Sequence, residues 1–298
     1  MGFCYSKFSS RGICVVKAIL TLLLILGISM LSACSAPWDD VKAKQAEADT
    51  RQMMHSLIAP DLQIYRERTL PPAELAQVKK NWSLVRKHFE LNEGEQASFN
   101  KLLNRFIEKN AEKHLQRDLN AKMKPLSNEM DSKWPLMQTS LDLLLQGWIE
   151  SSEQLTSAEK AHGRALVAAI IAQMPAEWLQ DKIMRERAFA QMVDIARALE
   201  IQNYQEYNEF SYGRFNDKLA QLFAGLKKLG LVYGLDWNAG QSQLEVKVLE
   251  QSGNKAKVQI RYPLGKKSVE FTMDLIEQDG RWYDASALKL FNSMRLEP

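Results

Sequence analysis

The side chains best suited to bind a ligand or exchange a proton lie late in the sequence. Asp274 and Asp284 belong to an acidic cluster that also contains Glu277 and Asp279. Carboxylates grouped in this way can hold a cation or act together as acid and base. Alternating strand positions and a hairpin tip explain the same acids as charges on a solvated sheet face. The pattern leaves both interpretations open.

Aromatic residues near these acids suggest a groove. Trp237 lies where the helical part of the chain gives way to strands, and Tyr262 and Trp282 lie within the strand region. Together with Asp274 and Asp284 they are the candidate groove residues. A small-ligand or enzymatic pocket built from them, at the junction of the sheet and the last helices, is our alternative hypothesis for the function.

Motifs that would specify a reaction are missing from the sequence. The histidines at 55, 88, 114 and 162 form neither an H-E-x-x-H nor an E-x-x-H pair, and zinc needs three or four convergent donors. There is no phosphate-binding glycine loop, dinucleotide fingerprint or G-x-S-x-G elbow. We therefore predict no metal, no cofactor and no catalytic residue. His114 lies seven residues after Ile107 and is expected to extend that helix's apolar stripe into the bundle.

The first residues have the pattern of an export signal. Residues 1–17 carry Lys7, Arg11 and Lys17 and no acid, and residues 18–31 are an apolar run of fourteen. A membrane-spanning helix needs about twenty apolar residues, so this run is too short to span. The order of bases followed by a short apolar core is typical of a cleaved signal peptide, which we place at residues 1–33.

The apolar run ends in Leu31-Ser32-Ala33-Cys34, a tetrapeptide that resembles the lipobox of bacterial lipoprotein signal peptides. The resemblance implies diacylglycerol on the Cys34 sulfur, cleavage between Ala33 and Cys34, and acylation of the new amino terminus. Ser35 follows the cysteine, and by the same resemblance this residue favours the periplasmic face of the outer membrane over the inner membrane. Two or three acyl chains would make the lipid bilayer a permanent partner.

Cysteine usage and charge agree with export. Cys4 and Cys14 lie in the leader and Cys34 would be consumed by lipid, so the mature body would hold no free thiol. A body without free thiols suits an oxidising compartment.

The formal charge of +3 comes from the three bases of the leader. The body is neutral, and nucleic acid is not expected as a partner because it requires a basic excess.

The middle of the chain reads as successive helices. A first helix is predicted over Asp39–Ile58, and its weak apolar periodicity is compatible with a spacer. Apolar residues then recur every three or four positions between breaks at proline and glycine, up to Gly230. Thr156 and Glu159 form a capping box, and residues 165–172 are apolar all round, which predicts the buried centre of the bundle. Three tryptophans lie on apolar helical stripes and are predicted to be core: Trp82, Trp134 and Trp148.

Beyond residue 240 the apolar period changes from 3.6 to 2. Alternating segments are separated by turns at Gly253-Asn254, Pro263-Leu264-Gly265 and Asp279-Gly280, so they predict an antiparallel meander of three to four strands with one apolar face. Such a face needs a cover, for which the helix ending at Gly230 is the obvious choice. The fold class is therefore α+β, an N-terminal multi-helix bundle followed by a small antiparallel β-meander packed on the last helices.

The segment IEQDGRWYDAS at residues 276–286 loosely resembles the closing hairpin of cone-shaped α+β domains of the nuclear transport factor two type, which occur in many bacterial lipoproteins. The chain departs from that family in having too few strands and far more helix, so no active residue is carried over.

These observations predict a domain plan of signal peptide 1–33, lipidated Cys34 with tether and polar helix 34–60, helical bundle 61–230, and antiparallel sheet domain 231–298. The leading functional hypothesis is a membrane-anchored periplasmic lipoprotein that acts as a non-catalytic binding or scaffolding module of the cell envelope. Its partner would be an unknown envelope protein, peptide or polymer.

Overall fold

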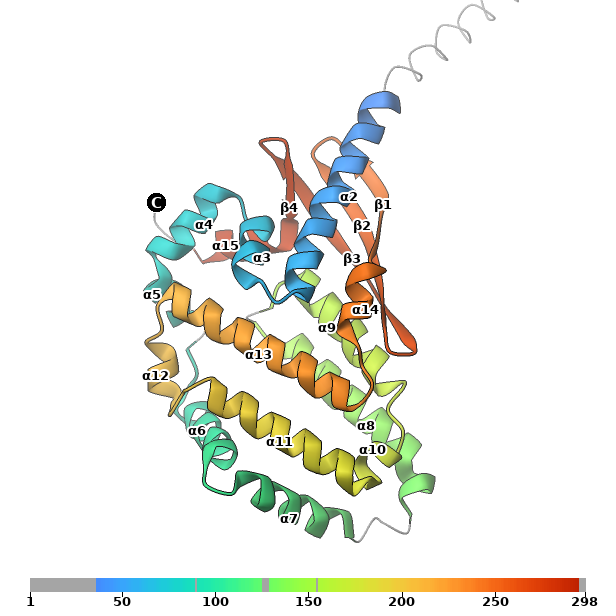
Figure 1. The fold of residues 1–298 in the computed structure, drawn as a ribbon. Coiled ribbons are helices and arrows are strands. Elements are labelled where there is room, and N and C mark those ends of the chain that lie inside the picture. The colour runs from blue at the N-terminus through green and yellow to red at the C-terminus, as the bar shows by residue number, and fades with distance from the viewer. Residues whose placement is uncertain (1–35, 89, 125–128, 154, 295–298) are drawn as a thin grey trace, which may run out of the picture. The chain divides into compact units, whose positions relative to one another are not determined.

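A computed structural model describes residues 36–88, 90–124, 129–153 and 155–294 (Figure 1). The chain divides into two units, residues 1–44 and residues 45–298. Of the first unit only helical residues from 36 onward are described, with Lys44 paired to Asp40. The predicted signal peptide, its cleavage site at Ala33 and the lipidated Cys34 lie outside the described residues.

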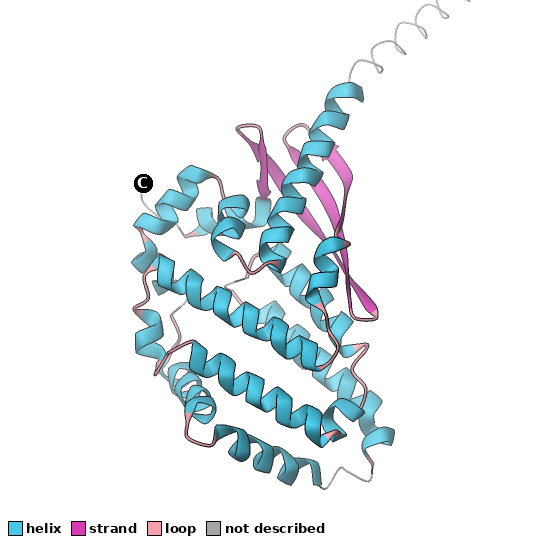
Figure 2. Cartoon of the chain, in the orientation of Figure 1, coloured by secondary structure: helices cyan, strands magenta, loops and turns pink. Residues whose placement is uncertain are grey.

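The fold class predicted from the sequence is confirmed: helices come first and a four-stranded antiparallel sheet with a closing helix follows. Figure 2 distinguishes the helices, in cyan, from the strands, in magenta. The first helices are α2 (Ala36–Ile58), α3 (Leu62–Thr69), α4 (Pro72–Lys80), α5 (Trp82–Lys87), α6 (Glu93–Ile107), α7 (Ala111–Met123) and α8 (Met130–Ser151). The next are α9 (Ser157–Ile171), α10 (Glu177–Gln180), α11 (Lys182–Ala198), α12 (Tyr204–Asn208), α13 (Tyr212–Val232) and α14 (Trp237–Ser242). The strands are β1 (Glu245–Ser252), β2 (Lys255–Leu264), β3 (Lys267–Gln278) and β4 (Arg281–Asp284), and α15 (Ala285–Ser293) follows them.

The sheet is the predicted meander, in the order β1-β2-β3-β4. Ile260 of β2 faces Phe271 of β3, and Val258 faces Met273, so the apolar residues of neighbouring strands share one face. Two-residue turns connect β1 to β2 and β3 to β4. Gly253 in the first turn, and both Asp279 and Gly280 in the second, have positive φ, which is the conformation that such hairpins require.

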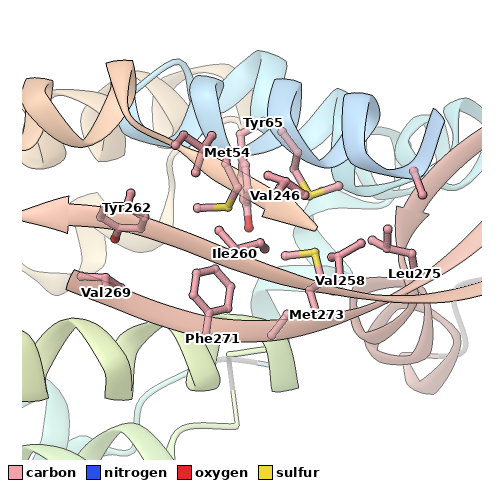
Figure 3. Packing of buried hydrophobic residues seen from close by; sticks show 14 of the residues in the cluster. Met54, Tyr65, Val246, Val258, Ile260, Tyr262, Val269, Phe271, Met273 and Leu275 are labelled. Carbon is pink, nitrogen blue, oxygen red and sulfur yellow. The ribbon is translucent and has the colours of Figure 1, made fainter. Parts of the chain in front are cut away.

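The apolar face of the sheet is filled by side chains from α2, α3 and α9. Met54 of α2 and Tyr65 of α3 enter the same core as Ile260 and Phe271 (Figure 3). The helix expected to be the main cover, α13, contributes only partly buried residues such as Leu219. Other helices lie against the strands instead: α9 packs against β3 and α14 packs against β2. The helix α13 packs mainly against α11.

The helix that the sequence left open as a spacer is instead part of this core from Gln45 onward. Ala46 and Met53 are completely buried, and so are the polar residues Asp49 and Thr50 between them. These residues lie three and four positions apart and form one stripe. The polar members of the stripe lower its apolar contrast, which is why periodicity alone made this helix look exposed.

Hydrogen bonds join α2 to both edge strands. The Glu47 carboxylate accepts a hydrogen bond from the Val248 amide of β1 at 3.0 Å. The Asp49 carboxylate accepts one from the Trp282 amide of β4, also at 3.0 Å. A main-chain amide buried at a sheet edge is costly to leave unpaired. The two acids therefore hold α2 across the sheet.

The remaining helices form a layer in which α11 packs against α13, α7 and α6. The helix that contains Ile107 was expected to continue through His114, but the chain breaks into α6 and α7 at Asn110, which adopts a left-handed conformation at φ 62°. His114, expected inside the bundle, is 43% exposed and pairs with Glu108. Because α7 begins anew after the break, its buried residues are Ala111 and Leu115, and His114 lies on the solvent side of the helix.

Two other boundaries differ from expectation. The helix α13 continues past Gly230 to Val232, and Gly234, with φ 73°, follows its end. The β2–β3 turn lies at Gly265, one residue after the strand ends. The capping box at Thr156 and Glu159 is confirmed.

Among the described residues, no helix combines the length and the apolar character needed to cross a membrane.

Close packing of α11 on α13 makes Gly225 a sensitive position. A Cβ at Gly225 would lie 2.4 Å from Cγ1 of Ile195, whereas one at Gly213 of the same helix meets nothing within 4 Å. We expect Gly225→Ala to lower the free energy of unfolding by about 1–2 kcal/mol, because overpacking outweighs the gain in helix propensity. Gly213→Ala, the matched control, should leave it equal or slightly higher. Chemical denaturation measures both, and equal effects would contradict this account of the α11–α13 contact.

Candidate functional site

The closing hairpin places one carboxylate in the interior. Asp284 ends β4, caps the amino end of α15 and is 1% exposed. Its Oδ1 atom accepts hydrogen bonds from the Ser286 amide at 2.8 Å and from the Ser286 hydroxyl at 2.6 Å. This is N-capping geometry, in which a side-chain oxygen satisfies amides that the helix leaves free.

A second capped helix meets the first at this point. The Ser286 hydroxyl accepts a hydrogen bond from the Ala158 amide in the first turn of α9 at 3.3 Å. Glu159 of the same turn closes the capping box of α9 and has the Arg66 guanidinium of α3 3.9 Å from its carboxylate. The starts of α9 and α15 are thus linked to α3 through one polar cluster, which also includes Asp284.

Burial shifts the proton equilibria of this cluster. Desolvation raises the pKa of Asp284 to about 6, partly opposed by the hydrogen bonds from Ser286 and reinforced by the charge of Glu159. Desolvation also raises the pKa of the buried Tyr65 hydroxyl well above its ordinary value, and the carboxylates of Glu159 and Asp284 add to the rise. A carboxyl group that titrates near pH 6 can exchange protons under physiological conditions.

The second perturbed group faces the sheet from α9. The His162 ring stacks on Phe271 with ring centroids 4.6 Å apart, and its Nε2 lies 2.5 Å from the Tyr262 hydroxyl oxygen. Burial lowers the pKa of His162 to about 4 and raises that of Tyr262 above its ordinary value. The imidazole is therefore neutral at pH 7, and the pair is a satisfied hydrogen bond inside the core.

The five candidate groove residues do not share one surface. Tyr262 and Trp282 are 2% and 1% exposed within the apolar core, and Trp237 packs against that core from α14. Asp284 lies in the buried cap described above. Asp274 lies on the opposite face of the sheet and is exposed. Strand alternation explains the separation, because successive side chains point to opposite faces.

Two surfaces that the sequence did not single out are open to solvent. The first is a groove of about 520 Å³ where α9 lies against β3, and it is lined from the sheet by Gln259, Glu270, Phe271 and Thr272. Its walls include Gln146, Ala161, Arg164, Ala165, Glu270 and Thr272. Glu270 is held there by Arg261 at 2.8 Å and by Gln259 at 2.6 Å, and Arg164 pairs with Glu150. The groove thus presents alanines between two ion pairs.

The second open surface is the outer face of α8. This helix packs against α9. Trp134, predicted to be core, is buried near the start of α8 against Ala176, Met123 and Met174. Trp148 was predicted to be core as well, and this prediction is wrong because its side chain is 69% exposed. Apolar residues occur nearly all round α8, so its sequence contains more than one stripe. Which stripe is buried depends on where α9 lies.

No group of three or more histidine, cysteine, aspartate or glutamate side chains able to hold a metal ion occurs in the described parts of the chain. Comparison with protein-family models, with curated proteins and with solved structures finds no match for this chain. The resemblance of residues 276–286 to cone-shaped domains therefore stays a prediction, as does the lipobox.

Asp284 and His162 should make opposite contributions to the dependence of stability on pH. The pKa of Asp284 rises from 3.8 to about 6 on folding, so the unfolded chain loses its proton first and stability falls as pH rises through this range. The pKa of His162 falls from 6.5 to about 4, so stability rises as pH rises through that range. Each contributes up to about 3 kcal/mol, and in the native protein the two largely cancel.

We expect single substitutions to reveal the two slopes. Asp284→Asn keeps a capping oxygen and removes the ionisation, so stability should rise steadily from about pH 4 to 6.5. His162→Gln keeps a partner for Tyr262, and stability should then fall between about pH 4 and 6. Denaturant unfolding across pH measures both. Parallel profiles for the two variants and the native protein would contradict the assignment.

Proposed function

We propose that this chain is a bacterial lipoprotein, anchored through acylated Cys34 at the periplasmic face of the outer membrane, whose body is a non-catalytic binding or scaffolding module. The anchor is proposed from the leader of residues 1–33 and its lipobox. The neutral charge of the remaining chain and the missing catalytic motifs support a binding role. The partner would be an envelope protein, peptide or polymer.

The observation that carries the binding role is the filled interior beside the open groove. Side chains from α2, α3 and α9 occupy the apolar face of the sheet, and Ile260 and Val269 within it are fully buried. A small-ligand site is usually a concave pocket with converging polar groups. The groove between α9 and the sheet is open, and it exposes polar and small side chains together, which suits a macromolecular partner.

The alternative, an enzymatic or small-ligand pocket at the junction of the sheet and the last helices, is supported by one observation. Asp284 is a buried carboxyl group whose pKa is raised to about 6, and such groups are often catalytic. Its hydrogen bonds, however, all serve the start of α15. We therefore favour the structural role of Asp284 and the binding hypothesis.

Lipid attachment is tested by labelling growing cells with a radioactive fatty acid and isolating the full chain. The native protein and Cys14→Ser should carry label, because Cys14 would be removed with the leader. Cys34→Ser should carry none and should accumulate with its leader uncleaved, because the modified cysteine is what the peptidase recognises. Label retained in Cys34→Ser, or absent from the native protein, would refute the anchor.

The groove is tested by placing a photoreactive phenylalanine analogue at Thr272 of the full chain in cells. Lys113 on α7, also exposed and outside the groove, is the matched control position. We expect irradiation to give a discrete adduct with one envelope component from position 272 and not from position 113. That adduct should be lost when Arg164→Glu reverses the charge on the facing wall. Equal adducts at both positions would refute a specific role for the groove.

A further inference from the structure

The outer face of α8 exposes more apolar surface than a solvated helix needs. Four of its side chains stand out: Leu136 is 71% exposed, Leu143 67%, Leu144 69% and Trp148 69%. Together they present on the order of 500 Å² of apolar surface, which is the size of the largest patch on a typical monomer. Patches of this size often mark an interaction site.

The position of α8 is set by its opposite face. The Trp134 indole donates a hydrogen bond to the Met174 carbonyl at 3.0 Å, and the Gln138 amide donates one to the same oxygen at 2.6 Å. The Ile149 side chain is 5% exposed and contacts Gly163 of α9. Because these contacts fix the rotation of α8, the four exposed residues cannot turn inward.

The centre of the exposed face is a stripe with internal symmetry. Its residues are spaced alternately by three and four positions: Lys133, Leu136, Ser140, Leu143, Gly147 and Glu150, all exposed. This spacing is the seam of a coiled coil. When the stripe is aligned with its own reversed copy, each leucine lies opposite a small residue, and Lys133 lies opposite Glu150.

We propose that α8 pairs antiparallel with α8 of a second copy of this chain. In the register that places Leu143 opposite Ser140, the same two-fold axis places Leu136 opposite Gly147 and Lys133 opposite Glu150. Each leucine then fits over a small residue, and opposite charges meet at both ends. The contact is isologous, as a two-fold interface must be.

Gly147 supplies an independent argument for close approach. A glycine in the interior of an exposed helix costs about 1 kcal/mol relative to alanine. No contact within the described part of the chain explains it, because a Cβ at Gly147 would meet no atom there within 4 Å. A leucine of a second copy lying over the backbone at this position would require a residue without a side chain.

Charge and area favour a second copy over a lipid surface. The helix carries Lys133 against three acids, whereas helices that bind anionic lipid are rich in bases. Leu136 and Leu143 lie in the stripe and Leu144 and Trp148 lie on one flank of it. Two such faces would bury at most on the order of 1,000 Å² of apolar surface, and polar flanks would have to bring the interface into the range of about 1,200–2,000 Å² for stable interfaces. The inference does not depend on acylation of Cys34.

The first experiment measures the mass of the full chain in non-ionic detergent by sedimentation. The native protein and Gly213→Gln should be dimers, because Gly213 lies on α13 with open space around it. Gly147→Gln should be a monomer with unchanged helix content, because its side chain fills the space that Leu136 of the second copy needs. A monomeric native protein, or a dimer unaffected by Gly147→Gln, would overturn the proposal.

The register is tested by charge exchange. Lys133→Glu and Glu150→Lys should each weaken dimerisation by about tenfold, because each places like charges opposite one another. The double variant should regain native affinity. Lys133 and Glu150 now pair with Glu129 and Arg164 of their own chain, but their side chains are 52% and 62% exposed, so each can turn to a new partner. A double variant no better than the single ones would refute this register.

The occupant is identified in cells by thiol cross-linking. Ser140→Cys and Leu143→Cys are co-expressed with different tags and treated with a short bis-maleimide. We expect a product of twice the chain mass that carries both tags, and none when cysteine replaces Lys113 in both chains. Adducts of another mass would identify a different protein on α8, and the absence of adducts would indicate a lipid surface or bare solvent. Either result would overturn the proposal.

Discussion

The structure depends on covering one face of a four-stranded sheet. The alternating residues of β2 and β3 place their large apolar side chains, except Ile276, on the same side. The chain has to bring helices to that side from distant parts of the sequence. It does so with α2, α3 and α9. Glu47 and Asp49 then hold α2 across both edge strands by accepting main-chain hydrogen bonds. These bonds link residues about two hundred positions apart in the chain.

The helices that cover the sheet also bury polar side chains, among them Asp284 and His162, which both have hydrogen-bond partners. Asp284 and Ser286 join the start of α15 to the start of α9, and His162 is bonded to Tyr262 beneath the same helix. The pKa of the carboxyl rises and that of the imidazole falls because both lose water on folding. The shifted pKa values of Asp284 and His162 are therefore explained by burial against α9 and by the capping of α15.

The surfaces left over are those on which function can be built. One is the groove where α9 lies against β3, and the other is the outer stripe of α8. The helix α9 lies between β3 and α8, and the face of α8 that points away from α9 carries the exposed leucines and Trp148. A helix in the outermost layer with apolar residues on both faces is the natural place for a second chain to bind.

The sequence by itself determined the fold class, the period change near residue 240, the hairpin turns and the capping box, because each follows from local backbone chemistry. The strand alternation also placed Tyr262 and Asp274 on opposite faces of the sheet, which already argued against one groove that contains both. Only the tertiary structure decided that the polar-looking helix α2 is core and that Trp148 is surface. The physical reason is that periodicity shows which residues share a face, while burial depends on which neighbour arrives to cover it.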